Sequence, residues 1–221
     1  MRRGNDMQIY IMRHGETYWN KERLIQGSSD IELTDFGIEL AEETRDGFVK
    51  DQIQFQRIYT SPYIRAVKTA EIINEKQHVQ ICVDPRIREM CFGKYEGQSL
   101  RELKTVDENI VNCFSKPSLY QPDETGESYE EVYDRVRDFL QNELLPLEQD
   151  PETDCVLVVC HGAVIRAFLT WIRHMELDEF WSIHQPNCSV NLIELKNGTF
   201  RSVKENIIYY ESEEMLHRGI L

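Results

Sequence analysis

Residues 155–160, CVLVVC, restrict the fold of this chain more than any other stretch. The run is almost wholly apolar and does not alternate with polar residues. That pattern is typical of a strand that is buried on both faces of a parallel sheet. It predicts a central sheet with other elements packed against each face.

Strand and helix patterns alternate along the rest of the chain. The expected strands are 7–12, 57–60, 79–84 and 155–160, and the expected helices are 33–51, 62–76, 127–148 and 163–175. Near the end, 189–205 predicts a hairpin that closes at Asn197 and Gly198. We therefore expect an α/β fold, a three-layer α/β/α sandwich with a mostly parallel central sheet and one antiparallel edge strand.

Helix-start signals support this reading. Thr34 is the expected N-cap of the first long helix, and Ser128 with Glu131 has the spacing of a capping box. Ser61 is the expected N-cap of a further helix, with Pro62 at its first helical position. The signal at Ser61 and Pro62 places a helix start directly after the expected strand 57–60.

The composition indicates one domain over residues 1–221. The chain is 41% hydrophobic, enough for one sizeable core, and it has no Pro-, Gly- or Ser-rich linker. No apolar stretch approaches the roughly 20 residues that span a bilayer, and the start lacks the features of a signal peptide. We expect a cytoplasmic protein. Met7 is an alternative start, which would leave residues 1–6 as an unstructured extension.

The formal net charge of −14 argues against nucleic acid or an anionic membrane as a partner, because both are bound through clustered Lys and Arg. An anionic substrate would need a local cationic pocket. The six cysteines include no C-x-x-C pair and most lie among apolar residues, so we interpret them as reduced thiols in packing roles. No metal site is expected.

Two histidines share one local context. His14 and His161 each follow an apolar strand, precede a glycine, Gly15 or Gly162, and lead into a helical segment. Ligands of open α/β sheets bind outside the carboxyl ends of the strands, where helix N-termini offer free N–H groups. One histidine–glycine pair alone is most often a turn. Two such pairs favour a site.

Two arginines indicate the kind of ligand. Arg13 precedes the first histidine, and Arg65 lies one turn into the helix after Ser61. Arginine stays charged and donates in a planar, bidentate manner to phosphate oxygens, and glycine lets the backbone approach closely. The four side chains therefore predict an anion site that contains imidazole.

The same residues, with several further motifs, resemble the histidine phosphatase superfamily, also called phosphoglycerate mutase-like. The resemblance covers nearly the whole chain. It is carried, in the family's order, by RHGETYWN at 13–20, QG at 26–27, LTDFG at 33–37, TSPYIRAVKTAEII at 60–73, REMCFGKYEG at 88–97 and CHGAVIR at 160–166.

The resemblance implies roles for these residues. His14 would be the nucleophile that becomes phosphorylated, Glu89 the general acid and base, and Arg13, Arg65 and His161 the ligands of the phosphoryl oxygens. Further substrate or pocket positions would be Gly15, Thr17, Asn20, Gln26, Gly27, Gly162 and Asn187. From the residues alone, an ordinary salt bridge of Glu89 to Arg86 or Arg88 is the preferred interpretation.

Within the family, the sequence favours a phosphatase. Mutases usually carry a longer, basic segment between the acid and the second histidine, whereas residues 92–160 here hold 16 Asp and Glu against 6 Lys and Arg. FGKYEGQSL at 92–100 also resembles the broad-specificity phosphatases of the family. A cofactor-dependent phosphoglycerate mutase is the first alternative, and a non-catalytic phosphate-binding module is the second.

The expected partner is a small-molecule phosphomonoester, with no cofactor, no nucleic acid and no membrane, and a homodimer is compatible with the sequence. Four aromatic residues fit either an apolar specificity pocket or the core: Trp19, Tyr95, Trp171 and Trp181.

Overall fold

A six-stranded sheet forms the centre of the computed structural model, which describes residues 6–211. The strand order is β3-β2-β4-β1-β5-β6. The strands are β1 (Met7–Arg13), β2 (Arg57–Thr60), β3 (Gln80–Val83), β4 (Cys155–Cys160), β5 (Val190–Lys196) and β6 (Thr199–Ile207). The first four run parallel, β5 runs antiparallel to β1, and β6 pairs antiparallel with β5 at the edge.

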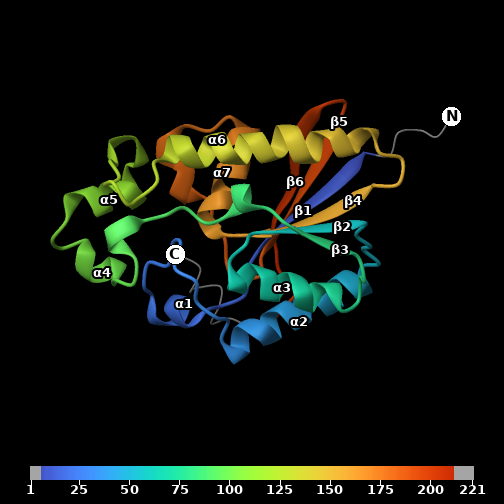
Figure 1. The fold of residues 1–221 in the computed structure, drawn as a ribbon, viewed down its shortest axis with the longest axis horizontal. Coiled ribbons are helices and arrows are strands. Elements are labelled where there is room, and N and C mark those ends of the chain that lie inside the picture. Colours follow the sequence, from blue (N-terminus) through green and yellow to red (C-terminus); the bar gives the residue numbers. More distant parts are fainter. Residues whose placement is uncertain (1–5, 212–221) are drawn as a thin grey trace.

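Helices cover both faces of this sheet, as Figure 1 shows. The α-helices are α1 (Tyr18–Glu22), α2 (Asp35–Lys50), α3 (Ile64–Asn74), α4 (Leu100–Leu103), α5 (Glu108–Ser115), α6 (Tyr129–Phe139) and α7 (Gly162–Arg173). In that view α6 and α7 lie above the sheet, and α2 and α3 lie below it. Two clusters of buried apolar side chains fill the two spaces between the layers. The predicted α/β/α sandwich is confirmed.

Shorter helical turns connect these elements. The 3₁₀ turns are η1 (Pro85–Ile87), η2 (Gly93–Tyr95), η3 (Pro117–Leu119), η5 (Leu145–Gln149) and η6 (Leu177–Ser182), and η4 (Leu140–Leu144) is a π-helical turn. The predicted helix over 127–148 is therefore α-helical only as far as Phe139. Beyond that point the chain changes to π and then 3₁₀ geometry, and Pro146, which has no N–H to donate, lies in the last of these turns.

Local signals predicted several boundaries correctly. The Thr34 hydroxyl accepts a hydrogen bond from the Gly37 N–H and caps α2, and Ser128 and Glu131 form the predicted capping box of α6. Asn197 and Gly198 have φ values of 51° and 74°, as a tight hairpin turn requires. The hairpin of β5 and β6 lies at the predicted edge of the sheet.

The predicted start of the helix after β2 was wrong. α3 begins at Ile64, with Tyr63 as an N-cap that makes no side-chain capping bond, and not at Pro62 after a Ser61 cap. The Ile64 N–H donates instead to the carboxylate of Asp30 at 2.7 Å. The Ser61 hydroxyl is engaged elsewhere, 2.6 Å from Nε2 of His161. A tertiary contact therefore takes the side chain that the local pattern assigned to capping.

The segment with α4 and α5 extends beyond the carboxyl ends of the parallel strands (Figure 1). This arrangement places a separate wall opposite the strand ends. The wall joins the main body through ring contacts: Phe114 of α5 lies 4.7 Å from Trp181 of η6 and 5.6 Å from Phe92, measured between ring centroids. The site lies between this wall and the sheet.

The beginning of the described chain is tied to the hairpin. Of the predicted extension 1–6, residues 1–5 lie outside the described residues, and the carboxylate of Asp6 forms an ion pair with Lys196 at 2.8 Å. All six cysteines are free thiols, and four of them are buried. Over residues 6–211, no helix is both long enough and apolar enough to cross a membrane.

Candidate active site

The register of β1 and β4 brings the two histidines together. The strands are parallel neighbours in the middle of the sheet, with Arg13 opposite Cys160. The first residue after each strand is a histidine, and the two rings lie 5.1 Å apart between centroids. Residues far apart in the sequence thus meet because their strands end at the same edge.

His14 presents one ring nitrogen to the pocket. The ring is 3% exposed, and its Nδ1 lies 2.7 Å from the carbonyl oxygen of Gly15. A carbonyl oxygen only accepts, so Nδ1 carries the proton and Nε2 keeps a free lone pair. Burial, and then the charges of Arg65 and Arg13, hold the pKa of His14 well below its ordinary value. The ring is therefore a neutral base with an open nitrogen.

Gly15 is required by a close backbone contact. A Cβ at this position would lie 2.4 Å from the carbonyl oxygen of Gly37, which is far too close for two atoms that are not bonded. The Gly15 N–H also donates to the hydroxyl of Thr69 at 3.0 Å. Glycine after the histidine thus lets the start of α2 pack directly against the end of β1.

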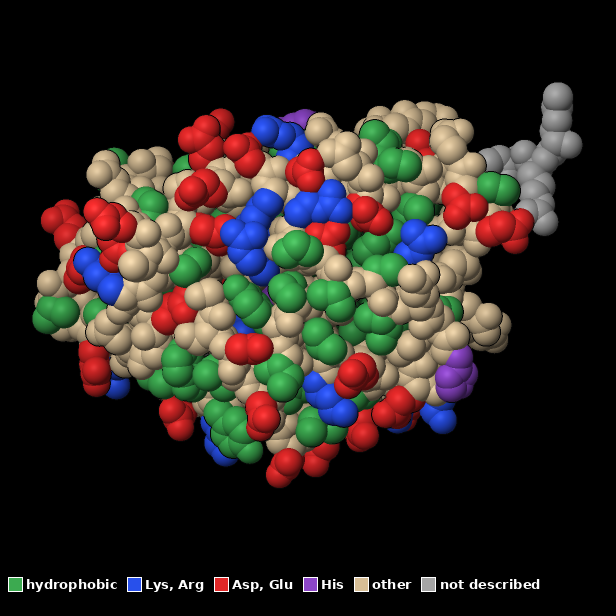
Figure 2. Space-filling model, in the orientation of Figure 1, with side chains coloured by type: hydrophobic (Ala, Val, Ile, Leu, Met, Phe, Trp, Pro, Cys, Tyr) green, Lys and Arg blue, Asp and Glu red, His purple; other side chains and the backbone are tan. Residues whose placement is uncertain are grey.

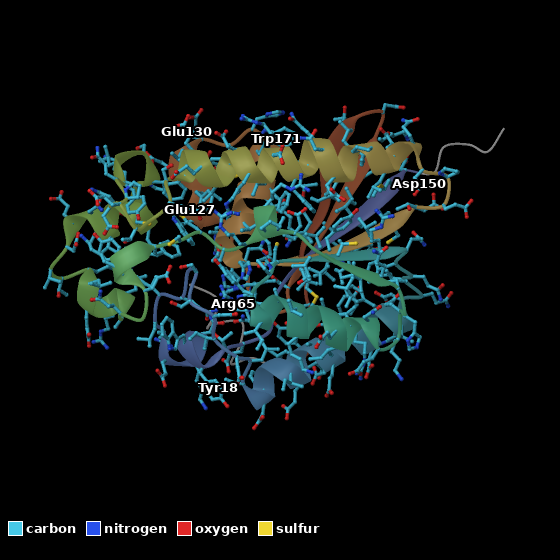
Figure 3. All side chains as sticks on the ribbon, in the orientation of Figure 1. Tyr18, Arg65, Glu127, Glu130, Asp150 and Trp171 are labelled. Atoms are coloured by element: carbon cyan, nitrogen blue, oxygen red, sulfur yellow. The ribbon has the colours of Figure 1, made fainter. Side chains whose placement is uncertain are left out.

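Arg65 lies at the start of α3 (Figure 3). Its side chain is fully buried and is held by backbone carbonyls. Its NH1 donates to the carbonyl of Ser29 and its NH2 to that of Gly27, both at 2.7 Å. Its Nε lies 3.3 Å from Nδ1 of His161. Burial lowers the pKa of this guanidinium to about 10, so it remains charged at neutral pH.

His161 has both ring nitrogens engaged. Because Nδ1 faces the Nε–H of Arg65, it accepts, and the proton lies on Nε2, which donates to the hydroxyl of Ser61. The ring is completely buried. Burial, followed by the charge of Arg65, holds the pKa of His161 well below its ordinary value. This histidine is neutral and fixed in orientation.

Glu89 approaches the same pocket from the segment after β3. One carboxylate oxygen accepts the N–H of Ala163 at the start of α7 at 3.2 Å, and the other accepts the N–H of Met90. The two arginines that the sequence suggested as salt-bridge partners of Glu89 pair with other carboxylates. Arg86 pairs with Asp84, Asp138 and Glu143, and Arg88 pairs with Glu127.

A clamp formed by Arg135 and Glu127, which the sequence reasoning missed, holds the segment around Glu89. The NH1 group of Arg135 donates to the carbonyls of Arg86 and Arg88 at 2.8 and 2.7 Å. Its partner Glu127 accepts from Nε of Arg135 and also from the N–H of Cys91. These bonds lie on either side of Glu89 in the sequence and set its position. Both residues lie in an ordinary amphipathic stretch, which offered no local signal.

The other predicted contacts divide between lining and support. The pocket is lined by Arg13, His14, Asn20, Gln26, Gly27, Arg65, Glu89 and Gly162, with the additional side chains of Phe92, Phe114, Arg166 and Trp181. Behind this lining, Thr17 caps α1 and contacts Gln26, and Asn187 donates to the carbonyl of His14 at 3.0 Å. The predicted residues thus form one constellation of contacts and supports.

Of the four aromatic candidates, Trp181 lines the pocket. Tyr95 belongs to the buried core on the α6 and α7 side of the sheet, and Trp171 packs against that core. The six-membered ring of Trp19 lies beside Gly97. The aromatic residues therefore serve both purposes that the sequence allowed.

The charge of the pocket differs from that of the surface. On the face drawn in Figure 2, acidic side chains surround the basic ones, in keeping with the net charge of −14. Inside, Arg13, Arg65 and Arg166 are each no more than 3% exposed, and Glu89 is the carboxylate that lines the pocket with them. This arrangement suits a dianion such as a phosphoryl group.

The chain belongs to the histidine phosphatase superfamily (branch 1), whose model matches residues 9–208. A relative from Bacillus subtilis named "Uncharacterized phosphatase PhoE" is 36% identical over 200 residues, covering 90% of this chain and 94% of that protein. Among solved structures, Bacillus stearothermophilus YhfR is 32% identical and superposes with a TM-score of 0.82, covering 92% of this chain and 98% of that one.

A third similarity is to a mutant phosphoserine phosphatase from Entamoeba histolytica, crystallised in complex with phosphoserine. It is 28% identical, with a TM-score of 0.75, and the match covers 90% of this chain and 96% of that one. The family resemblance stated from the sequence is thus confirmed.

Proposed function

We propose that this protein is a phosphomonoesterase that transfers the phosphoryl group of its substrate to Nε2 of His14 and then to water. One observation carries the proposal. The bond from Nδ1 to the Gly15 carbonyl leaves Nε2 as the open nitrogen of a neutral ring, at a pocket lined by Arg13 and Arg65. A neutral imidazole is a nucleophile for phosphorus, and a protonated one is not.

In the first step, Nε2 of His14 bonds to phosphorus and the ester P–O bond breaks. Arg13 and Arg65 bind the equatorial oxygens, where most of the charge resides. The ring becomes cationic as it is phosphorylated, and the bond from Nδ1–H to the Gly15 carbonyl strengthens with that charge. The departing oxygen takes a proton from Glu89, because an alkoxide is a poor leaving group.

In the second step, water attacks phosphorus and Glu89 takes its proton. The N–P bond breaks, inorganic phosphate leaves, and Nε2 regains its lone pair. The sum is one phosphomonoester and one water converted to an alcohol and phosphate. Glu89 is held by backbone N–H groups and its neighbours Arg86 and Arg88 have other partners, so its carboxylate is available for both transfers.

We infer hydrolysis and not isomerisation from the acidic segment between Glu89 and His161. A bisphosphorylated intermediate has to be retained for isomerisation, and the carboxylates of this segment repel it. The Entamoeba relative supports the same reading, since it is named a phosphatase and binds phosphoserine. Phosphoserine is therefore the first substrate to assay.

Phosphate release from a panel of phosphomonoesters tests the proposal. We expect turnover without added bisphosphoglycerate, and an acid-labile, base-stable phosphate on the quenched enzyme. Chelator should not inhibit, because arginines supply the charge that a metal ion supplies elsewhere. Isomerisation of phosphoglycerate that is faster than hydrolysis would favour the mutase, and binding without turnover would favour the non-catalytic module.

A further inference from the structure

Arg166 is a buried cation that the mechanism above does not use. It lies one turn into α7 and is 2% exposed. Its NH1 donates to the carbonyl of Gly162 at 2.9 Å, and its Nε has no hydrogen-bond partner among the described residues. A buried arginine usually has a carboxylate partner, because an unpaired charge is costly to remove from water.

A second buried cation, Arg13, lies close to Arg166. A Cβ placed on Gly162 would lie 3.0 Å from NH1 of Arg166 and 3.6 Å from Nε of Arg13, so the two guanidinium groups approach one point. Burial, and then the charge of Arg13, lower the pKa of Arg166 to about 9, and the charge of Glu89 opposes this. Arg166 is thus a third buried cation of the pocket, in addition to the two, Arg13 and Arg65, that the mechanism assigns to the phosphoryl oxygens.

Arg166 also lies where two hollows meet. It lines the phosphoryl pocket, and with Phe114 and Trp181 it lines a neighbouring pocket of about 260 Å³ that Lys104 and His184 reach as well. The space beside His14 is only about 40 Å³. A leaving group attached to the phosphoryl group can therefore extend past Arg166 into this neighbouring pocket.

The guanidinium of Arg166 is held in place for binding. Its Cζ lies 4.7 Å from the centre of the Trp181 ring, within the range of a cation–π contact. The indole N–H of Trp181 in turn donates to the carbonyl of Cys113 at 2.8 Å and to the hydroxyl of Tyr129 at 2.7 Å. A cation fixed in this way loses little conformational freedom when an anion binds.

We propose that Arg166 binds a carboxylate on the leaving group, so that the preferred substrates are small phosphomonoesters of hydroxy or amino acids. The proposal rests on the proposed function and specifies its substrate class. Because Arg166 and Arg13 approach the same point, the carboxylate has to lie within a few bonds of the phosphorus. The apolar faces of Phe114 and Trp181 favour a small, singly charged group over a second, strongly hydrated phosphate.

Two matched substrate pairs test this assignment. 3-Phosphoglycerate and glycerol 3-phosphate differ in a carboxylate, as do phosphoserine and phosphoethanolamine. We expect the wild-type enzyme to prefer the carboxylate member of each pair in kcat/KM. Arg166→Met should lower kcat/KM by about 30- to 3,000-fold for the carboxylate member, the usual consequence of removing one side of a buried charge pair. That loss should exceed the loss for the member without a carboxylate at least tenfold, with Arg166→Lys intermediate.

Arg173→Met is the matched control. Arg173 lies on the same helix, is exposed and pairs with Glu205. It should change both members of each pair equally. Equal losses in both members for Arg166→Met, or a wild-type enzyme without preference, would overturn the carboxylate assignment.

Binding to the His14→Ala protein separates this proposal from the proposed function, because that variant cannot form the phosphoenzyme. We expect calorimetry to show tighter binding of 3-phosphoglycerate than of glycerol 3-phosphate, and loss of this difference in His14→Ala/Arg166→Met. If the difference persists while the wild-type enzyme shows no turnover, the carboxylate site stands and the phosphatase assignment fails. If the difference in binding is absent while turnover is normal, the phosphatase assignment stands and the carboxylate site fails.

Discussion

The two histidine–glycine junctions share one pair of residues after a buried strand, and they differ in structure. After Gly15 the chain forms a loop and then the short helix α1, whereas His161 is itself the N-cap of α7. His14 keeps one ring nitrogen open, and His161 has both ring nitrogens bonded. The burial and charge that lower the pKa of each ring are similar in kind. Hydrogen-bond partners, and not charge, therefore distinguish the proposed nucleophile from its neighbour.

The largest difference between the two junctions is expected from His14→Ala. We expect activity to fall by roughly 10⁴- to 10⁶-fold, as when other covalent nucleophiles are removed. No labelled phosphate should remain on the quenched protein, and the circular dichroism spectrum should be unchanged. Full activity, or labelling of His161 in place of His14, would reverse the assignment of the two rings.

Glu89→Gln tests whether Glu89 protonates the leaving group in the first step and activates water in the second. We expect alkyl phosphates to slow by roughly 10²- to 10⁴-fold, the usual reach of general acid catalysis. A nitrophenyl phosphate should lose far less in the first step, because nitrophenolate leaves without a proton. Rapid-quench measurements should then show a burst of nitrophenol and accumulated phosphoenzyme.

The opposite result for Glu89→Gln is also specific. If both substrates slow by one factor and no phosphoenzyme accumulates, Glu89 has a structural role and the proton donor lies elsewhere.

His161→Ala is the partner experiment at the second junction. His161 accepts a hydrogen bond from Arg65 and so fixes this guanidinium, and loss of one such group from a site of charge stabilisation usually costs about 10²- to 10³-fold. We expect a loss of that size, with His14 still labelled by phosphate in a quenched reaction. If the loss is as large as that of His14→Ala and no phosphate label is found, His161 is as necessary as His14 for formation of the phosphoenzyme.

The smallest effect concerns stability, where the two junctions should behave alike. Both histidines have a folded-state pKa below the ordinary value, so unfolding takes up a proton at each of them when the pH lies below about 6.5. The resulting loss of stability is absent above that pH and grows as the pH falls towards the folded-state pKa. Each ring should contribute about 1.4 kcal/mol per pH unit to the decline in the free energy of unfolding.

Urea unfolding between pH 7.5 and 5 measures this slope. His14→Asn and His161→Asn should each reduce it by a similar amount. His78→Asn controls for the loss of a histidine at an exposed position, where φ is 54° and asparagine is well tolerated. If His78→Asn reduces the slope as much as the two junction variants do, burial of His14 and His161 is not the cause of the pH dependence.

The sequence predicted the layered fold because its signals are local. The apolar run 155–160, the Thr34 cap, the capping box at Ser128 and the turn at Asn197 each depend on residues within one or two turns, and each was confirmed. The ordered motifs also identified the family correctly. The meeting of His14 and His161 followed from the rule that parallel strands end at one edge.

Tertiary structure decided how each side chain is used. Ser61 has the sequence of a helix cap, yet its hydroxyl bonds to His161, because β2 and β4 are neighbours and bring the two together. Arg166 stands in an apolar helix, and only the packing of α7 beside Arg13 and Trp181 makes it part of the pocket. Local sequence determines which elements form, since helix and strand depend on nearby residues. The partner of a buried polar group depends on strands and helices that are distant in the chain, and it is set only when they pack.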